Sequence, residues 1–210
     1  MSTTMTPEQR VTMVFKLLES SSKEHIAGEM TQLDHALLTA QFAKNEGADE
    51  ETTLATLLVN IGHLIPAIEQ RTISHYRYDS LDSLSGVAGD ASVIDHGRVG
   101  GEYLRNLGFS DKTCELIESN VLAKRYLSTI KPRPALIVDD HPVVRLRNWG
   151  GPLSSTEIQE FEKDPLFKQK VQLAKWDATA TKATGAKPPT LDMYRDMAIR
   201  NLLLSIKMLY

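Results

Sequence analysis

Apolar residues recur three and four positions apart along most of this chain, and this spacing constrains the fold more than any other feature of the sequence. Such spacing places the apolar side chains on one face of a helix, so each stretch predicts an amphipathic helix. In chain order, we expect helices over residues 7–19, 31–46, 50–61, 99–107, 111–126, 155–161, 166–177 and 193–209. The sequence therefore predicts an all-α fold.

The residue types at the ends of these stretches agree with helix boundaries. Pro7 stands at the start of the first stretch, where proline is well tolerated. Thr31 with Asp34, and Ser154 with Glu157, match the pattern of a capping box. These signals support the expected starts of three helices.

Two segments do not carry the helical pattern. Residues 66–93 lose the periodicity and include His75, Tyr76 and Tyr78. Loops of this length usually bind something or are disordered, and we expect a lid-like loop there. Residues 136–149 begin like a strand and continue like a helix, and helix is the better prediction.

Composition narrows the class of protein. A chain of 210 residues, 41% hydrophobic and 24% charged, is long enough for one buried domain, which we expect to span residues 1–210. A net charge of -3 with mixed signs argues against a nucleic-acid surface. No stretch approaches the roughly 20 apolar residues that a membrane span needs. Because the single cysteine, Cys114, cannot form an internal disulfide, we expect a cytoplasmic protein.

Two common catalytic signatures are missing from the sequence. No glycine-elbow motif surrounds a serine, and Cys114 lies in a helical pattern, so a nucleophilic enzyme is disfavoured. The glycines of Gly97–Gly101 follow no predicted strand and are separated by Arg98 and Val99. They do not make a dinucleotide-binding loop.

Histidines are the remaining candidates for chemistry, and the chain has six: His25, His35, His63, His75, His96 and His141. A lone histidine is more often a structural residue than a ligand. Three have informative surroundings, because His35 and His96 each follow an aspartate and His63 ends the stretch Leu57–His63. Within that stretch, Asn60 and His63 are three apart and would share a helical face.

These stretches resemble the HD-domain superfamily of helical metal-dependent proteins, and in particular its branch of diiron oxygenases that cleave phosphonates. The likeness covers residues 24–194 and extends through Ala123–Leu127, Gly150–Pro152 and Trp176-Asp177. It implies a single-domain helical bundle in which histidines and aspartates hold two metal ions.

Only half of the metal-binding positions that the resemblance implies still carry a ligand. Those that match are His35, His96 and Asp177. The positions of a histidine, an aspartate and a second later histidine are taken by Val59, Asn60 and Asn120. Valine has no lone pair to offer, and asparagine is a neutral, weak donor. We therefore expect no metal and no cofactor, with iron held by the three remaining ligands as the alternative.

The resemblance also implies which side chains face a substrate. In the family, the position of His63 contacts substrate beside the metals, and that of Lys124 holds an anionic group. The expected catalytic set is His63, His96, Lys124, His35 and Asp177. The expected substrate contacts are Asn60, Asn120, His25, Tyr76 and Tyr78. Ala174 stands where the family has an arginine, so a phosphonate would lose a positive partner and we expect a different substrate.

Three functions fit these residues. The leading hypothesis is a repurposed, metal-independent enzyme, an isomerase, lyase or cyclase acting on a small organic intermediate of specialised biosynthesis, with histidines as acid–base groups. The first alternative is a metal-dependent oxygenase or phosphohydrolase with an unusual site. The second alternative is a non-catalytic small-molecule-binding or scaffold protein. The sequence indicates no oligomeric state.

Overall fold

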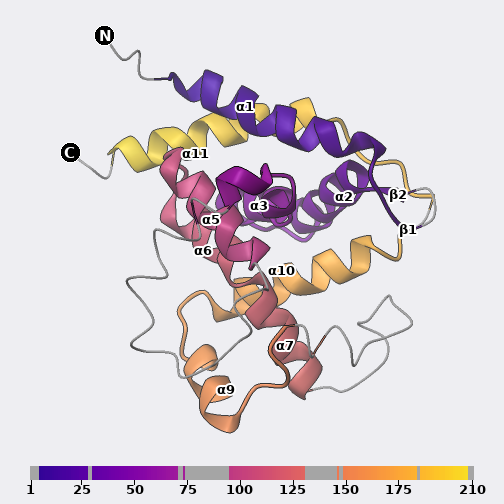
Figure 1. The fold of residues 1–210 in the computed structure, drawn as a ribbon, viewed down its shortest axis with the longest axis vertical. Helices are drawn as coiled ribbons and strands as arrows, with labels where there is room; N and C mark the ends of the chain where they lie inside the picture. The colour runs from indigo at the N-terminus through magenta and orange to yellow at the C-terminus, as the bar shows by residue number, and fades with distance from the viewer. Residues whose placement is uncertain are drawn as a thin grey trace.

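The computed structural model describes residues 5–27, 30–70, 73, 95–130, 146, 149–183 and 185–207. The described residues form α-helices, a few short 3-10 helices (η) and one small hairpin, in an order that Figure 1 traces from indigo to yellow. The elements are α1 (Pro7–Ser20), η1 (Ser21–Lys23), β1 (His25–Ala27), β2 (Met30–Thr31), α2 (Gln32–Asn45), α3 (Glu50–Leu58), η2 (Ile61–His63), α5 (His96–Asn106), α6 (Asp111–Glu118), α7 (Asn120–Ile130), α9 (Ser155–Glu162), α10 (Phe167–Ala180), η4 (Leu191–Tyr194) and α11 (Arg195–Lys207). The predicted all-α class is confirmed, apart from this antiparallel β1–β2 pair.

Helix starts follow the capping residues of the sequence. Thr31 and Asp34 form a capping box at the start of α2, and Ser154 and Glu157 form another at the start of α9. Each box satisfies backbone N–H groups that have no partner within the helix. At α3, the Asp49 side chain accepts from the Thr52 N–H and caps the helix in the same sense.

The main core lies where α3 is enclosed by α2, α6, α10 and α11 (Figure 1). Leu54, Leu57, Leu58 and Ile61 are fully buried there. Burying a side chain of this size contributes about 1.5–3 kcal/mol, so this short stretch is a large source of stability. The helix α1 packs against α11 and covers the core from the side that carries both described termini.

A second, smaller core joins α7, α9 and α10 in the lower half of Figure 1. Tyr126, Phe161 and Phe167 contact one another edge to face, with 5.3 Å between the ring centroids of each pair. This arrangement is favoured by the ring quadrupoles. Because α7 packs on α10, residues of these two helices meet at the candidate site.

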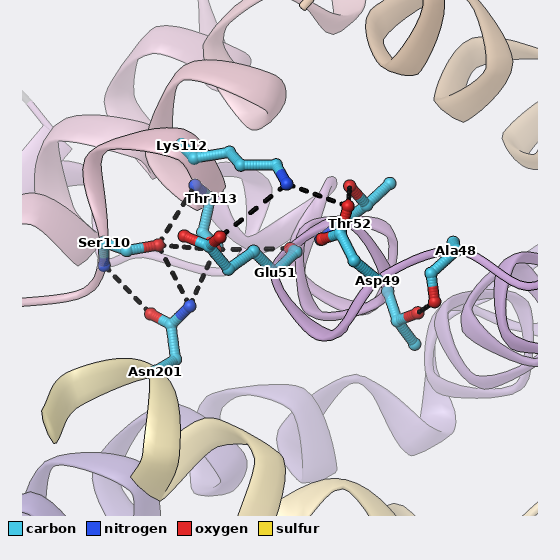
Figure 2. A network of polar contacts seen from close by, with 9 residues as sticks. Ala48, Asp49, Glu51, Thr52, Ser110, Lys112, Thr113 and Asn201 are labelled. Carbon is cyan, nitrogen blue, oxygen red and sulfur yellow. Dashed lines mark hydrogen bonds and ion pairs between the residues drawn. The ribbon is translucent and has the colours of Figure 1, made fainter. Parts of the chain in front are cut away.

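A network of buried polar side chains ties α6 to α11 and α3 (Figure 2). The amide oxygen of Asn201 accepts from the Ser110 N–H, and its amide nitrogen donates to the hydroxyls of Ser110 and Thr113. The Ser110 hydroxyl donates to that of Thr113, which donates to the Glu51 carbonyl oxygen. Every polar atom of this set has a partner, so the network fixes three helices relative to one another.

Several predicted helix boundaries are wrong: α5 begins three residues early, at His96, α10 continues to Ala180, and two further differences bear on the site. The helix expected over 50–61 ends at Leu58, and η2 begins only at Ile61, so Asn60 and His63 do not share one α-helical face. After the turn, Gly62 lies so close to the backbone of His96 that a Cβ there would be 1.8 Å from the His96 oxygen. The helix expected over 111–126 is broken at Ser119 into α6 and α7.

Other predictions lie wholly or mostly outside the described residues. The lid-like loop expected over 66–93 has only residues 66–70 and 73 within them, and the helix favoured over 136–149 has only residues 146 and 149. Among the helices that are described, none is long and apolar enough to cross a bilayer. The boundaries of the single domain stay a prediction.

Candidate functional site

Asp177 of α10 is the centre of a buried polar cluster to which four elements contribute. Its Oδ2 lies 2.7 Å from the Nζ of Lys124 on α7, and its Oδ1 accepts at 3.4 Å from the Nδ2 of Asn60, which follows α3. The Nε2 of His35 on α2 lies 3.7 Å from the same Oδ1. The structure therefore brings together four residues that the sequence proposed for the site.

His35 is held in one tautomer by its partners. Its Nε2 lies 3.0 Å from the backbone oxygen of Asp177 and 3.1 Å from the hydroxyl of Thr181. A carbonyl oxygen only accepts, so we assign the proton to Nε2 and the lone pair to Nδ1. That Nδ1 is buried and has no hydrogen-bond partner among the described residues.

The carboxyl of Asp177 stays ionised although it is buried. Burial alone would raise its pKa, but the charges of Lys124 and His35 and the hydrogen bonds from Lys124 and Asn60 outweigh burial and lower the pKa. The negative charge is thus retained in the interior, and it is balanced by side chains of this chain.

His63 and His96 form a second part of the site, where η2 meets the start of α5. Their rings stack with 4.0 Å between centroids and 28° between planes. The Nδ1 of His96 lies 3.3 Å from the carbonyl oxygen of Gly62. A Cβ on Gly62 would come within 1.8 Å of the His96 backbone oxygen, so only glycine allows this approach.

His63 is neutral at pH 7 even though part of the residue is exposed. Its pKa is lowered to about 4, first by partial burial of the ring and then by positive charge on His96 and Lys124, while Asp177 acts in the opposite direction. The low pKa fits the stacked geometry, because two imidazolium rings at that separation repel each other. Because Lys124 and Asp177 both act on the pKa of His63, the two parts of the site interact electrostatically.

Two of the positions that lost a metal ligand, Val59 and Asn120, are buried. Val59 is 2% exposed and belongs to the main core. Asn120, at the first turn of α7, is 4% exposed, and its Oδ1 has no partner among the described residues. Valine at the first position offers nothing to a metal, and the amide at the second offers at most a weak neutral donor.

The donor set does not fit a dinuclear metal centre. The Nε2 of His35, its nitrogen nearest Asp177, bonds to a backbone oxygen. Lys124 contacts Oδ2 of Asp177, and Asn60 donates to Oδ1. No group of three or more His, Cys, Asp or Glu side chains within the described ranges is arranged to hold a metal ion. We therefore derive no chemical step through a metal.

The remaining candidates lie apart from this cluster or outside the described residues. His25 lies on the exposed strand β1, away from the contacts of Asp177, and Tyr76 and Tyr78 fall outside the described residues. Burial raises the pKa of the Cys114 thiol to about 12, which agrees with its exclusion as a nucleophile. The substrate roles of His25, Tyr76 and Tyr78 stay predictions.

Sequence reasoning missed two residues of the site. The Nζ of Lys124 lies 5.8 Å from the ring centroid of Trp149, a cation–π contact, and Thr181 bonds to His35. Trp149 directly precedes the Gly150–Pro152 turn, and Thr181 comes one helical turn after Asp177. Their positions next to the Gly150–Pro152 turn and to Asp177 were the only features of the sequence that pointed to Trp149 and Thr181.

A helical bundle with histidines and an aspartate gathered from separate helices is consistent with the HD-domain superfamily. No protein-family model matches the chain. The chain is 31% identical over 194 residues to the hydroxymethylphosphonate dioxygenase of Gimesia maris, covering 92% of this chain and 89% of that protein. The chain belongs to the family of HD-domain phosphonate dioxygenases.

Two further relatives agree with this membership. An uncharacterized protein of Acanthamoeba polyphaga mimivirus is 29% identical over 92% of this chain and 82% of its own length. The [1-hydroxy-2-(trimethylamino)ethyl]phosphonate dioxygenase (glycine-betaine-forming) of Leisingera caerulea is 28% identical over 79% of this chain and 76% of its own length. Both relatives with a named activity are therefore enzymes.

Proposed function

We propose that the chain is an enzyme that transfers protons on a small organic molecule without a metal, as an isomerase, lyase or cyclase. The observation that carries this proposal is the donor set of the site. Val59, Asn60 and Asn120 replace metal ligands, whereas His96 keeps an imidazole nitrogen with no partner among the described residues. A positioned imidazole can move a proton at neutral pH, which each of these reaction types requires.

His96 is the proposed general base. Because its Nδ1 faces the carbonyl oxygen of Gly62, which only accepts, Nδ1 carries the proton of the neutral ring and Nε2 carries the lone pair. A substrate O–H or activated C–H that lies against Nε2 would give its proton to that nitrogen. Gly62 is then a positioning residue, since its carbonyl fixes which nitrogen is basic.

His63 limits the charge that the pair of histidines can hold. Its ring lies 4.0 Å from that of His96, and its pKa is lowered to about 4. Two imidazolium rings at this separation would repel each other, so His63 stays uncharged when His96 takes a proton from substrate. The neutral His63 ring then forms one wall of the site beside the base.

Unpartnered acceptors support a polar substrate. Asn120 Oδ1 and His35 Nδ1 are buried without a hydrogen-bond partner among the described residues. Leaving such an atom unsatisfied costs about 1–3 kcal/mol, which a ligand that donates to it would recover. The proposed substrate class is therefore a small organic molecule with hydroxyl or amine donors.

The mass balance of the reaction tests this function. Chelator-treated protein would be incubated with a small-metabolite extract in D2O, and products would be followed by mass spectrometry. An isomerase or cyclase gives a product of the substrate's mass apart from deuterium uptake, and a lyase gives two products whose masses sum to it. We expect such a product with the natural chain and its loss in His96→Asn. If His96→Asn converted the same compound at the same rate, His96 would not be the base.

Phosphonate oxygenation is the second candidate, and the comparisons favour it over the first, because both relatives with a named activity are phosphonate dioxygenases. The test is oxygen uptake by iron-loaded protein with hydroxymethylphosphonate and with [1-hydroxy-2-(trimethylamino)ethyl]phosphonate. The first proposal predicts no uptake above a no-enzyme control. Oxygen uptake that a chelator abolishes and iron restores would establish the second function in its place.

A further inference from the structure

We propose that Lys124 is a built-in replacement for a metal cation: its ammonium balances Asp177 and keeps divalent cations out of the site. This inference rests on the proposed metal-independent function, and it explains how the site dispenses with the metal. It assigns Lys124 a positioning role, in place of the anion-holding role that the family resemblance implied.

The charge of Asp177 needs a partner inside the protein. Its side chain is 8% exposed, and an ionised carboxylate at such a place is costly unless it is paired and hydrogen-bonded. Asn60 supplies one hydrogen bond but no charge, and the Nε2 of His35 bonds to the backbone oxygen of Asp177 and lies 3.7 Å from Oδ1. Among the described residues, Lys124 is the only lysine or arginine that pairs with Asp177.

Lys124 is held in place from two sides. Its Nζ lies 2.7 Å from Asp177 Oδ2 and 5.8 Å from the ring centroid of Trp149. Its side chain is 23% exposed, so it is neither a free surface lysine nor fully enclosed. The carboxylate and the aromatic face both favour a cation at this point.

The same ammonium opposes a metal ion. A divalent cation that reached Asp177 would have to displace Lys124 from Oδ2 or accept a positive charge beside it, with no carboxylate at Asn60 to compensate. An ammonium also offers only hydrogen-bond donors and no lone pair, so it cannot join a coordination shell. The substitutions at the ligand positions and the Lys124 ion pair thus act in the same direction.

The experiment measures Mn²⁺ binding by equilibrium dialysis with metal analysis, using chelator-treated natural chain and three variants. In Lys124→Met the carboxylate loses its counter-charge, and we expect Mn²⁺ affinity to rise by about tenfold or more. In Lys124→Arg the charge is kept, and affinity should stay at the level of the natural chain. In the double variant Lys124→Met with Asp177→Asn the charge to be balanced is gone, and the gain should disappear.

Each result decides the proposal. Equal Mn²⁺ affinity of the natural chain and Lys124→Met would overturn it, as would a gain that persists in the double variant. If Lys124→Met fails to fold, the unpaired Asp177 is the expected cause, and the double variant should fold again; a double variant that also fails to fold would overturn the proposal. Loss of the acid–base function is read separately, from turnover of His96→Asn, which leaves the Lys124–Asp177 pair intact.

Discussion

Two buried polar clusters of this protein solve the problem of burial in different ways. In the network of Ser110, Thr113 and Asn201 (Figure 2), the side-chain donors and acceptors meet other groups of the chain, and none of these three side chains is charged. In the cluster around Asp177, a buried carboxylate pairs with a lysine, and His35 Nδ1 lacks a partner among the described residues, as does Asn120 Oδ1 on the same helix as that lysine.

The difference separates a structural cluster from a functional one. A neutral network with every hydrogen bond made adds rigidity and leaves nothing for a ligand to bind. A cluster with buried unpaired acceptors is less stable than it would otherwise be, and groups of that kind are found where a ligand supplies the missing partner. Under the proposed function, the first region contributes stability and the second binds the small molecule.

The largest predicted effect concerns the backbone contact that assembles the candidate site. Gly62→Ala would place a Cβ 1.8 Å from the His96 carbonyl oxygen, and backbone cannot move aside cheaply. We expect a loss of about 4 kcal/mol in the free energy of unfolding, measured by denaturant titration. The matched control is Gly47→Ala, where the backbone has φ of 79° but no atom lies within 4 Å of the new Cβ. That variant should lose only about 1 kcal/mol.

Equal losses in the two glycine variants would contradict this account. They would mean that the backbone of η2 and α5 moves apart easily enough to admit the new methyl group at Gly62. The site would then not depend on the short separation between Gly62 and His96.

The sequence predicted the helices well, because apolar spacing and capping residues act within one or two turns. One boundary that it missed adjoins a contact between elements distant along the chain. The turn after Leu58 leads to Gly62, which packs against His96, 34 residues later in the sequence. No pattern within 50–61 records that contact, so periodicity alone extended the helix too far.

The candidate site was predictable only in part. The family resemblance identified Asp177, His35, Asn60 and Lys124, which the structure brings into contact. The stacking of His63 on His96 was not predictable, because it follows from the turn that ends α3. The ion pair between Lys124 and Asp177 was not predictable either, because it depends on the distance between α7 and α10.

The next prediction tests the structural cluster. Asn201→Ala removes three hydrogen bonds and leaves the Ser110 N–H buried without its acceptor. We expect a loss of about 3 kcal/mol in the free energy of unfolding, with no direct effect on ligand binding. Arg200→Ala, on the adjacent residue of α11, is the control, because it removes only an exposed ion pair with Glu50 and should cost under about 1 kcal/mol. If both variants lost the same stability, the network would not be a source of rigidity.

The smallest predicted effect on stability comes from Asn120→Ala, the counterpart of Asn201→Ala on α7. Asn120 is 4% exposed and Asn201 is 3% exposed, so Asn120→Ala and Asn201→Ala compare the loss of an amide at equal burial. The Oδ1 of Asn120 has no partner to lose among the described residues, and relief of its desolvation offsets the small cavity that alanine leaves. Asn120→Ala should therefore change the free energy of unfolding by less than about 1 kcal/mol and still weaken turnover of any substrate found in the metabolite screen. A loss as large as that of Asn201→Ala, measured in the same denaturant titration, would mean that the Asn120 amide is structural, and the division between the two clusters would fail at that residue.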